Sequence, residues 1–500
     1  MTLDALGHDY PKQDTRVIPF LREVWRLFPQ APGLVEDVWP PEQLVYLGDY
    51  LDGLGCKTII VESHYIDRDY VNDVALFYAR SLRSYPNYCQ RVHFFAADFD
   101  SDRWRELVTA RDDPSRQSAA GFLRSAYLGF CVVRPLPGAP VGRTVLKTYQ
   151  GNSPKGHRRH FGAVREYLAH LAGFELPVMG LAFQQQDQGV SACATTALWS
   201  AMHCVAHMEA LPVPTPAEIT EAAARYFLPG GRSLPSEGLT VHQICEATRA
   251  AGLAPMLMRS VSPALDRAQL FAYAMSGLAP VLAIQPQGVP DGHAVCAVGM
   301  KLGDVEPQTD PALHYRDAST AMKGLYVHDD RLGPYARAEL HPHTDGSSIR
   351  TGVRIETEVS TLAALIVPVP VKLRLSVTRM RALGMAVAEA AGHRLFPEFN
   401  RQVTLNCLYK QAPTHKGEAR GFGLSADGLY KLACGIVLSR YIGVIQISGP
   451  PGPLFDVILD ATETRANPSA LACVKREGLP AGAESKVAAI ATRLAATFIA

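Results

Sequence analysis

The chain has 500 residues, of which 47% are hydrophobic, and its formal net charge at pH 7 is +1. A balanced charge argues against nucleic acid or an anionic membrane surface as the partner. The sequence contains no run of about 18 apolar residues, so no membrane-spanning helix is predicted. The length predicts about two to four structural units.

The cysteines and the first residues suggest a reducing compartment. The 10 cysteines include no CxxC pair, which argues against a zinc ribbon, a thioredoxin-like site or a disulfide framework. The opening MTLDALGHDYPKQDTR lacks the charged and then apolar pattern of a secretory signal. We therefore expect a cytoplasmic protein with reduced thiols.

Residues 1–175 are predicted to form an N-terminal α/β unit. A short helix around Val17–Leu27 is followed by prolines between Ala31 and Pro41, which mark a boundary. The polar stretch Arg111–Ser118 contains a proline and is interpreted as a surface loop. The remaining predicted elements are helices over Gln43–Leu54 and Asp69–Leu82, and strands over Thr58–Val61, Arg91–Ala96, Tyr127–Arg134 and Gly142–Thr148.

The segment KGHRRHF carries two histidines, His157 and His160, between basic residues. Such a patch can contact phosphate, but the preceding GNSPKG lacks the spacing of a phosphate-binding loop. A solvated loop is the preferred interpretation.

The stretch from Leu181 to Met208 organises the rest of the chain. It predicts a short strand, a glutamine-rich turn and a helix that begins at about Cys193. Five apolar residues of this helix share the spacing of one buried face; they are Leu198, Ala201, Met202, Val205 and Met208. A cysteine at a helix start meets unpaired N–H groups and the positive end of the helix dipole, and both favour the thiolate.

The residues after this helix predict two more helices and three strands. Thr215 with Pro216 and Glu218 has the pattern of a capped helix start, as does Thr240 with Gln243, and Gly252 is the predicted stop of the second helix. Strands are predicted over Pro280–Gln285, His293–Gly299 and Gly324–Asp329.

Three of these positions carry residues suited to nucleophilic catalysis. A lone cysteine in a helix is usually a small core residue, as we expect for Cys204, Cys245 and Cys296. Cys193, however, is followed by His293 at a strand start and Asp329 at a strand end. An imidazole can take the thiol proton, and a carboxylate can orient the ring.

An oxyanion formed on a substrate needs hydrogen-bond donors. The amide N–H of Cys193 and a glutamine side chain would serve. The candidates upstream are Gln184, Gln185, Gln186 and Gln188.

The order Q-x6-C, then GHAVCAVG, then YVHDD followed by GPY resembles the papain-fold cysteine peptidases. It is most similar to the branch of bacteriocin-leader and related bacterial peptidases, and it covers about residues 180–370. The resemblance implies Cys193 as nucleophile, His293 as base, Asp329 as orienting residue and Gln186 as oxyanion donor. It implies no cofactor and no metal.

The resemblance also implies an α+β fold with a papain-like core in residues 176–372. In that core a helix carrying the cysteine packs on an antiparallel sheet carrying the histidine and the aspartate. This chain departs from the family where Ala194 replaces the usual glycine. Asp330 is an alternative to Asp329, and Gln184 and Gln188 are alternatives to Gln186.

Residues 373–500 are predicted to form a C-terminal α/β unit, after a strand over Thr361–Val371 that completes the sheet. No chemistry is recognised in this unit, which could bind a partner. The predicted elements are helices over Ser376–Ala391, Ala426–Leu438 and Ser485–Ala496, and strands over Ile442–Ser448 and Leu454–Leu459.

Two further histidine pairs are given no catalytic role. His203 and His207 share a helix face, but no glutamate lies between them as in a metalloprotease helix, so a packed or solvated face is preferred to a metal site. His341 and His343 are expected in a loop.

The sequence therefore predicts a cysteine hydrolase, most simply a peptidase, that acts on a protein or peptide through a thioester intermediate. An acyltransferase or transglutaminase-like enzyme would use the same triad. A catalytically lapsed papain-fold scaffold is the alternative from another class, and a bacterial effector or defence component is compatible with either. The substrate and the roles of the flanking units stay open.

Overall fold

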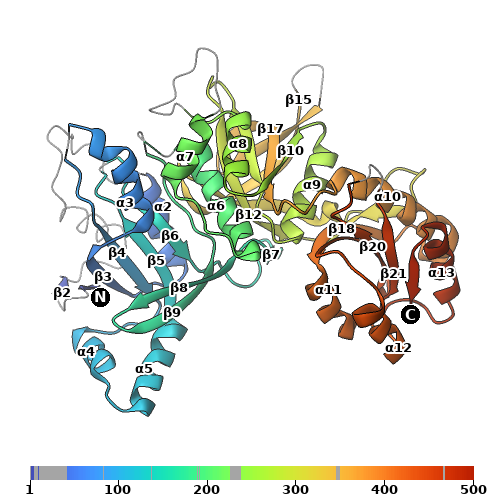
Figure 1. Cartoon of the computed structure of the whole chain (residues 1–500), viewed down its shortest axis with the longest axis horizontal. Helices are drawn as coiled ribbons and strands as arrows, with labels where there is room; N and C mark the ends of the chain where they lie inside the picture. The colour runs from blue at the N-terminus through green and yellow to red at the C-terminus, as the bar shows by residue number, and fades with distance from the viewer. Residues whose placement is uncertain are drawn as a thin grey trace.

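The computed structural model shows an α+β chain in which three large sheets of the described residues follow one another from the N-terminal to the C-terminal side, with a separate two-stranded sheet beside them (Figure 1). The predicted helix Val17–Leu27, the proline cluster and Gln188 lie outside the residues that the structure describes. The described residues are 2–4, 9–10, 42–82, 84–136, 138–187, 190, 192–225, 238–344, 349–464 and 468–500.

The N-terminal sheet, as far as it is described, has six strands in the order β2-β1-β3-β4-β5-β6. Strands β4 and β5 are buried at every residue, which is typical of strands covered on both faces. The strands are β1 (Thr2–Asp4), β2 (Asp9–Tyr10), β3 (Thr58–Tyr65), β4 (Cys89–Phe95), β5 (Tyr127–Val133) and β6 (Val141–Leu146). The helices of this unit are α2 (Glu42–Gly53), α3 (Arg68–Leu76), α4 (Ser101–Thr109) and α5 (Asp113–Ala126).

The loop predicted over Arg111–Ser118 was wrong, because these residues begin helix α5. The Asp112 side chain caps the helix by accepting a hydrogen bond of 2.9 Å from the Ser115 amide. Pro114 occupies the first turn, where its missing N–H costs nothing. The same residues that suggest a loop are therefore a helix start signal.

The central sheet is built around a closed barrel. In the described residues the barrel strands follow the order β17-β11-β12-β14-β15-β16, and β16 pairs back to β17, which closes a ring of six. Strand β10 pairs with β17, and β7 pairs with β12. These strands are β7 (Arg158–His160), β10 (Ala254–Arg259), β11 (Val281–Pro286), β12 (His293–Leu302), β14 (Met322–Asp329), β15 (Gly333–Thr344), β16 (Ile349–Ile355) and β17 (Glu358–Val369).

Strand β12 is buried on both faces, which explains its unbroken apolar sequence. Val295 and Ala297 belong to the core inside the barrel, whereas Ala294 and Cys296 belong to the core shared with helix α6 (Cys193–Glu209). Neighbouring strand residues point to opposite faces, so one strand joins the barrel to the helix. Helix α6 lies against β12 in Figure 1.

The remaining helices of the central unit follow their sequence signals. Both predicted capping boxes are present, at Thr215 for α7 (Pro216–Ala224) and at Thr240 for α8 (Val241–Ala250). Gly252 has φ of 78°, the left-handed conformation expected after a helix end. A further helix, α9 (Pro263–Met275), starts at a Ser262 cap. A hairpin of β8 (Arg165–Leu171) and β9 (Phe174–Gly180) leads towards α6.

The C-terminal sheet has the described order β13-β18-β19-β20-β21-β22. Strand β13 (Tyr315–Asp317) comes from the polar stretch between β12 and β14, so this stretch reaches across to the neighbouring unit. The other strands are β18 (Val403–Gln411), β19 (Tyr441–Gly449), β20 (Gly452–Asp460), β21 (Ala470–Lys475) and β22 (Thr497–Ile499).

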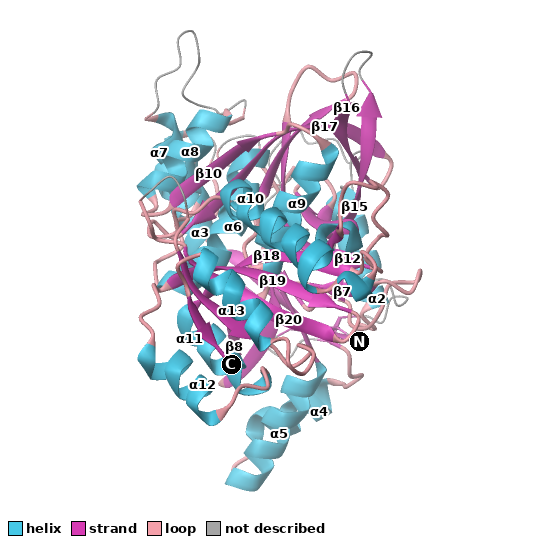
Figure 2. Cartoon of the chain, turned by 90° about the vertical axis from the view of Figure 1, so that its right-hand side faces the viewer, coloured by secondary structure: helices cyan, strands magenta, loops and turns pink. Residues whose placement is uncertain are grey.

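Helices α10 and α13 lie together on one side of this sheet (Figure 2). The helix predicted over Ala426–Leu438 is shorter, because α12 ends at Tyr430 and a π-helical turn continues to Gly435. The C-terminal helices are α10 (Val377–Ala390), α11 (Ala412–Glu418), α12 (Ala426–Tyr430) and α13 (Glu484–Arg493). Within the described part of the chain, no helix is long and apolar enough to cross a membrane.

Replacing Thr215 by alanine should lower the free energy of unfolding by about 1 kcal/mol, because the cap of α7 is lost. The Thr215 hydroxyl accepts from the Glu218 amide at 3.2 Å and from the Asn72 side chain at 2.5 Å. Urea denaturation would measure the change. Thr215→Ser is the control, because it keeps the accepting oxygen, and an equal loss in both variants would contradict the cap assignment.

Candidate active site

Cys193 is the first residue of α6, and its side chain is half-buried. The capping position before it is Ala192, which makes no side-chain cap hydrogen bond. No side chain oxygen therefore competes for the N–H groups of the first turn at that position. Their partial positive charge favours a thiolate on the cysteine at this place.

His293 and Asp329 meet because β12 and β14 are antiparallel. In this register Cys296 lies opposite His328, so the start of one strand lies beside the end of the other. The His293 Nε2 atom is 3.0 Å from Asp329 Oδ1, and the two side chains are 5% and 2% exposed.

The Cys193 side chain lies close enough to the His293 ring to help raise the pKa of that ring. Since Nε2 faces Asp329, Nδ1 is the ring nitrogen left for the sulfur. The structure thus brings Cys193, His293 and Asp329 into one contact chain. Their catalytic roles stay a prediction.

Charge in this cluster favours the imidazolium form. Burial by itself would lower the pKa of His293, but the hydrogen bond to Asp329, the Cys193 side chain and the nearby carboxylates outweigh burial and raise the pKa to about 10. For Asp329, burial would raise the pKa, but the hydrogen bond and charge of His293 prevail and lower it. The ring therefore favours the form that holds a proton, which is the form that can donate a proton to a leaving group.

Asp330 is the second carboxylate beside the ring, 3.8 Å from His293 Nε2. Both of its carboxylate oxygens are buried without a hydrogen-bond partner. Burial, aided by the charge of Asp329 and opposed by that of His293, raises the pKa of Asp330 to about 7. Asp329 makes the hydrogen bond, and Asp330 contributes at longer range.

Arg331 is a neighbour that the sequence reasoning missed, although it directly follows the two aspartates. Its Nε lies 3.2 Å from His293 Nε2, and its backbone amide donates to Asp329 Oδ1 at 3.0 Å. A guanidinium can only donate, so it bonds to the neutral ring with its proton on Nδ1. The imidazolium instead donates from Nε2 to Asp329.

The side chains of His293, Asp329 and Asp330 also offer oxygen and nitrogen ligands for a cation. His293, Asp329 and Asp330 hold potential ligand atoms within 4.8 Å of one another in the described residues. The positively charged Arg331 side chain already lies against this group, and it would repel a metal ion. We therefore interpret the carboxylates as partners of the imidazole and the guanidinium.

The glutamines before Cys193 differ in what they contact. The Gln185 side chain accepts from the Val141 amide at 3.2 Å and donates to the Gly138 carbonyl at 3.3 Å, so it is committed to the N-terminal unit. Side chains alternate along an extended segment, which turns Gln184 and Gln186 to the opposite side. The Gln184 Nε2 atom is buried without a partner, whereas Gln186 is half-buried.

The barrel holds the start of this segment at Leu181. The Leu181 carbonyl lies 3.1 Å from His328 Nε2, and its amide donates to the Tyr335 hydroxyl at 2.9 Å. Burial lowers the pKa of His328 to about 3. Because Nδ1 of this neutral ring accepts from the Tyr335 amide at 3.2 Å, Nε2 carries the proton and donates to Leu181.

The other histidine pairs lie apart from this cluster. His203 is buried against Trp199, with ring centroids 4.5 Å apart, while His207 is exposed. The loop prediction holds for His157, which precedes strand β7, but it was wrong for His160, His341 and His343. His160 lies in strand β7, and both His341 and His343 lie in strand β15.

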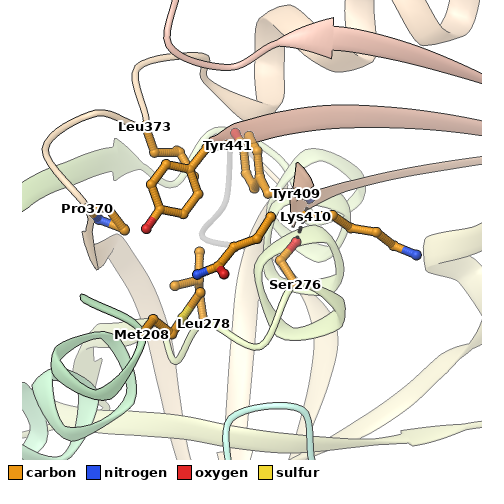
Figure 3. A pocket seen from close by; sticks show the side chains of 9 residues that line it. Met208, Ser276, Leu278, Pro370, Leu373, Tyr409, Lys410 and Tyr441 are labelled. Carbon is orange, nitrogen blue, oxygen red and sulfur yellow. Dashed lines mark hydrogen bonds between the residues drawn. The ribbon is translucent and has the colours of Figure 1, made fainter. Parts of the chain in front are cut away.

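Two cavities lie away from the cluster. One of about 30 Å³ lies between α6 and the C-terminal sheet near Met208, Leu278 and Tyr441, and has room for about one water molecule (Figure 3). Met208 is about 22 Å along the helix from Cys193, at 1.5 Å per residue. The other, a groove of about 790 Å³, lies between α3 and α7 and includes Asn72 and Glu218. Neither is lined by the triad residues.

Comparison of the chain with protein-family models and with curated proteins found no match.

Replacing Asp329 by asparagine should lower the pKa of His293 by about 1–3 units, the usual effect of a close opposite charge. Histidine ring signals followed by NMR from pH 5 to 10.5 would measure this. In the native protein the ring should stay protonated far above the ordinary value of 6.5 and lose its proton at about pH 10. The stability that this proton contributes is complete below pH 6.5 and is lost as the pH rises through 10.

The neighbouring His328 provides the internal control for this titration, because its buried ring should stay neutral throughout. An unchanged His293 titration in Asp329→Asn would contradict the proposed pairing. Asp330→Asn should have the smaller effect, because Asp330 makes no hydrogen bond to the ring.

Proposed function

We propose that this protein is a cysteine hydrolase of papain-like type, most simply a peptidase, with Cys193 as the nucleophile. The observation that carries the proposal is the position of His293 between the Cys193 thiol and the Asp329 carboxylate. These are three residue types in the order and contacts that thiol acyl transfer requires. The site lies at a helix start, where an anionic sulfur is stabilised.

The proposed reaction has two steps. The Cys193 thiolate attacks an amide carbonyl, and the His293 imidazolium donates its proton to the leaving amine, which leaves a thioester. A water molecule then gives a proton to His293 and attacks the thioester, which releases the acid and restores the thiolate beside the imidazolium. Asp329 keeps the ring oriented throughout.

The architecture supports the papain-like assignment. The helix that carries the cysteine packs on a strand of an antiparallel barrel, and that strand and its neighbour supply the histidine and the aspartate. The oxyanion of the first intermediate would be bound by the Cys193 amide and by Gln186, which lies seven residues before it. Gln186 is preferred to Gln185 because the Gln185 side chain is already occupied.

Two alternatives use the same residues differently. An acyltransferase or transglutaminase-like enzyme would transfer the acyl group of the thioester to an amine in place of water. A lapsed papain-fold scaffold would keep the fold without the reaction, and the two flanking units favour partners. The contact chain from Cys193 to Asp329 favours an enzyme over the scaffold.

Cys193 should react with iodoacetamide at pH 6 at least ten times faster than Cys434, which is exposed and serves as a control within the same chain. An ordinary thiol is mostly protonated at this pH, whereas a catalytic cysteine paired with an imidazolium reacts as the thiolate. Mass spectrometry of the labelled peptides would measure both rates. In His293→Ala the advantage should disappear, and equal rates in the native protein would contradict the enzyme proposal.

Gln186→Ala should lower turnover of the best substrate from a mixed peptide library by about 100-fold, the usual cost of one lost oxyanion donor. Alkylation of Cys193 should stay unchanged, because it forms no oxyanion. Gln184→Ala is the matched control and should stay within about threefold of the native rate. The reverse pattern would move the donor role to Gln184.

A further inference from the structure

The segment that leads to Cys193 is attached to the edge of the N-terminal sheet. Phe183 and Thr144 of β6 exchange both backbone hydrogen bonds, at 2.8 and 2.9 Å. Further on, the Gln185 amide donates to the Val141 carbonyl at 3.0 Å. The residues that lead to the nucleophile, Phe183 and Gln185, therefore extend the sheet beyond its edge strand β6.

A buried arginine, Arg134, contacts the same segment at Gln185 and Asp187. Arg134 follows β5, and its side chain is 1% exposed. Its Nη2 donates to the Gln185 carbonyl at 2.9 Å, and its Nε donates to the Ala139 carbonyl at 3.1 Å. Its Nη1 lies 3.5 Å from Asp187 Oδ2, close enough for an ion pair but without hydrogen-bond geometry.

Asp187 links Arg134 to the residues just before the nucleophile. Its Oδ1 accepts from the Val190 amide at 2.6 Å, and Val190 lies three residues before Cys193. The Tyr78 hydroxyl also bonds to Asp187. On the other side, the Thr220 hydroxyl of α7 donates to the Val190 carbonyl at 2.8 Å. Gln185, Asp187 and Val190, which precede the nucleophile, are thus held between the N-terminal unit and α7.

Asp73 of α3 lies nearby but is not the partner of Arg134. Both of its carboxylate oxygens are buried without a hydrogen bond. Burial and the charge of Asp187 raise the pKa of Asp73 well above its usual value, which favours its neutral form. The carboxylate that balances the Arg134 charge is therefore Asp187.

We propose that Arg134 is a positioning residue for the nucleophile, which makes the N-terminal unit part of the active centre. Arg134 acts through the Gln185 carbonyl and the Asp187 carboxylate. This inference rests on the proposed function, because it takes Cys193 as the nucleophile. Without the guanidinium, a buried carboxylate and a carbonyl would lose their partner. The segment before Cys193 would then leave the geometry that faces His293.

Two measurements on the full chain test this proposal. The first is the rate of Cys193 alkylation by iodoacetamide at pH 6, per folded molecule. The second is hydrogen exchange of the peptide that contains the Gln185 and Val190 amides. The variants are Arg134→Met, which removes the charge, and Arg134→Lys, which keeps the charge but loses the forked donor.

Arg91→Met is the matched control. Arg91 is another buried arginine of the same sheet, and it bonds to Glu62 and to the His170 carbonyl rather than to the segment before Cys193. Both methionine substitutions remove the arginine from a carboxylate that keeps another partner, His93 for Glu62 and the Val190 amide for Asp187, so they should destabilise the fold to a similar degree. Only Arg134→Met removes contacts with the residues before Cys193.

Arg134→Met should slow Cys193 alkylation at least tenfold and speed exchange of the Gln185 and Val190 amides, and Arg134→Lys should fall between it and the native protein. Arg91→Met should stay within twofold on both measurements. Equal effects of the two methionine variants, or none for Arg134→Met, would overturn the proposal. If Arg134→Met does not fold, Asp187→Asn tests the same ion pair and should shift both measurements in the same direction.

Failure of the proposed function and failure of the positioning role give different results. If Cys193 of the native protein reacts no faster than Cys434, the proposed function fails. Hydrogen exchange then decides alone whether Arg134 holds the segment. If Cys193 is highly reactive and Arg134→Met changes neither measurement, the positioning role fails while the proposed function stands.

Discussion

The candidate site depends on one buried contact, the hydrogen bond between the His293 ring and the Asp329 carboxylate. Water cannot screen these charges because both side chains are almost fully covered. The contact holds the ring so that its second nitrogen faces Cys193, and it favours the protonated ring that a thiolate needs as its partner. Asp330 and Arg331 adjust the balance of charge, since one adds a buried carboxyl group and the other a cation close to the same nitrogen.

This contact is possible because β12 serves two cores. Its alternating side chains fill the barrel on one face and pack against α6 on the other. The helix with the nucleophile and the sheet with the base are therefore fixed to the same strand. A shift of one residue in the pairing would exchange the two faces of β12 and would separate His293 from both partners.

The flanking units are connected to the central unit by exchanged strands and buried polar contacts. The stretch between the histidine strand and the aspartate strand contributes β13 to the C-terminal sheet, and β7 from the N-terminal part joins β12. Thus strand pairing crosses both of the domain boundaries that were expected, one at residue 175 and the other at residue 372. The polar contacts at the Cys193 segment, from Arg134 on one side and Thr220 on the other, follow the same pattern.

Local signals in the sequence determined the elements that carry the site. A helix beginning at Cys193, two capping boxes and the strand ends with His293 and Asp329 each depend on residues a few positions apart, and each is present in the structure. The error at Arg111–Ser118 arose because aspartate and proline suit a loop as well as a helix start. The buried side chains later in α5, which are Ala119, Leu123 and Ala126, decide between these two outcomes.

The tertiary structure alone decided the contacts between distant segments. These include closure of the barrel by β16 and β17, the position of Arg331 on the ring, and the commitment of Gln185 to the N-terminal sheet. The physical reason is that pairing register and buried polar partners depend on residues far apart in the chain, and no local pattern of side chains encodes that distance.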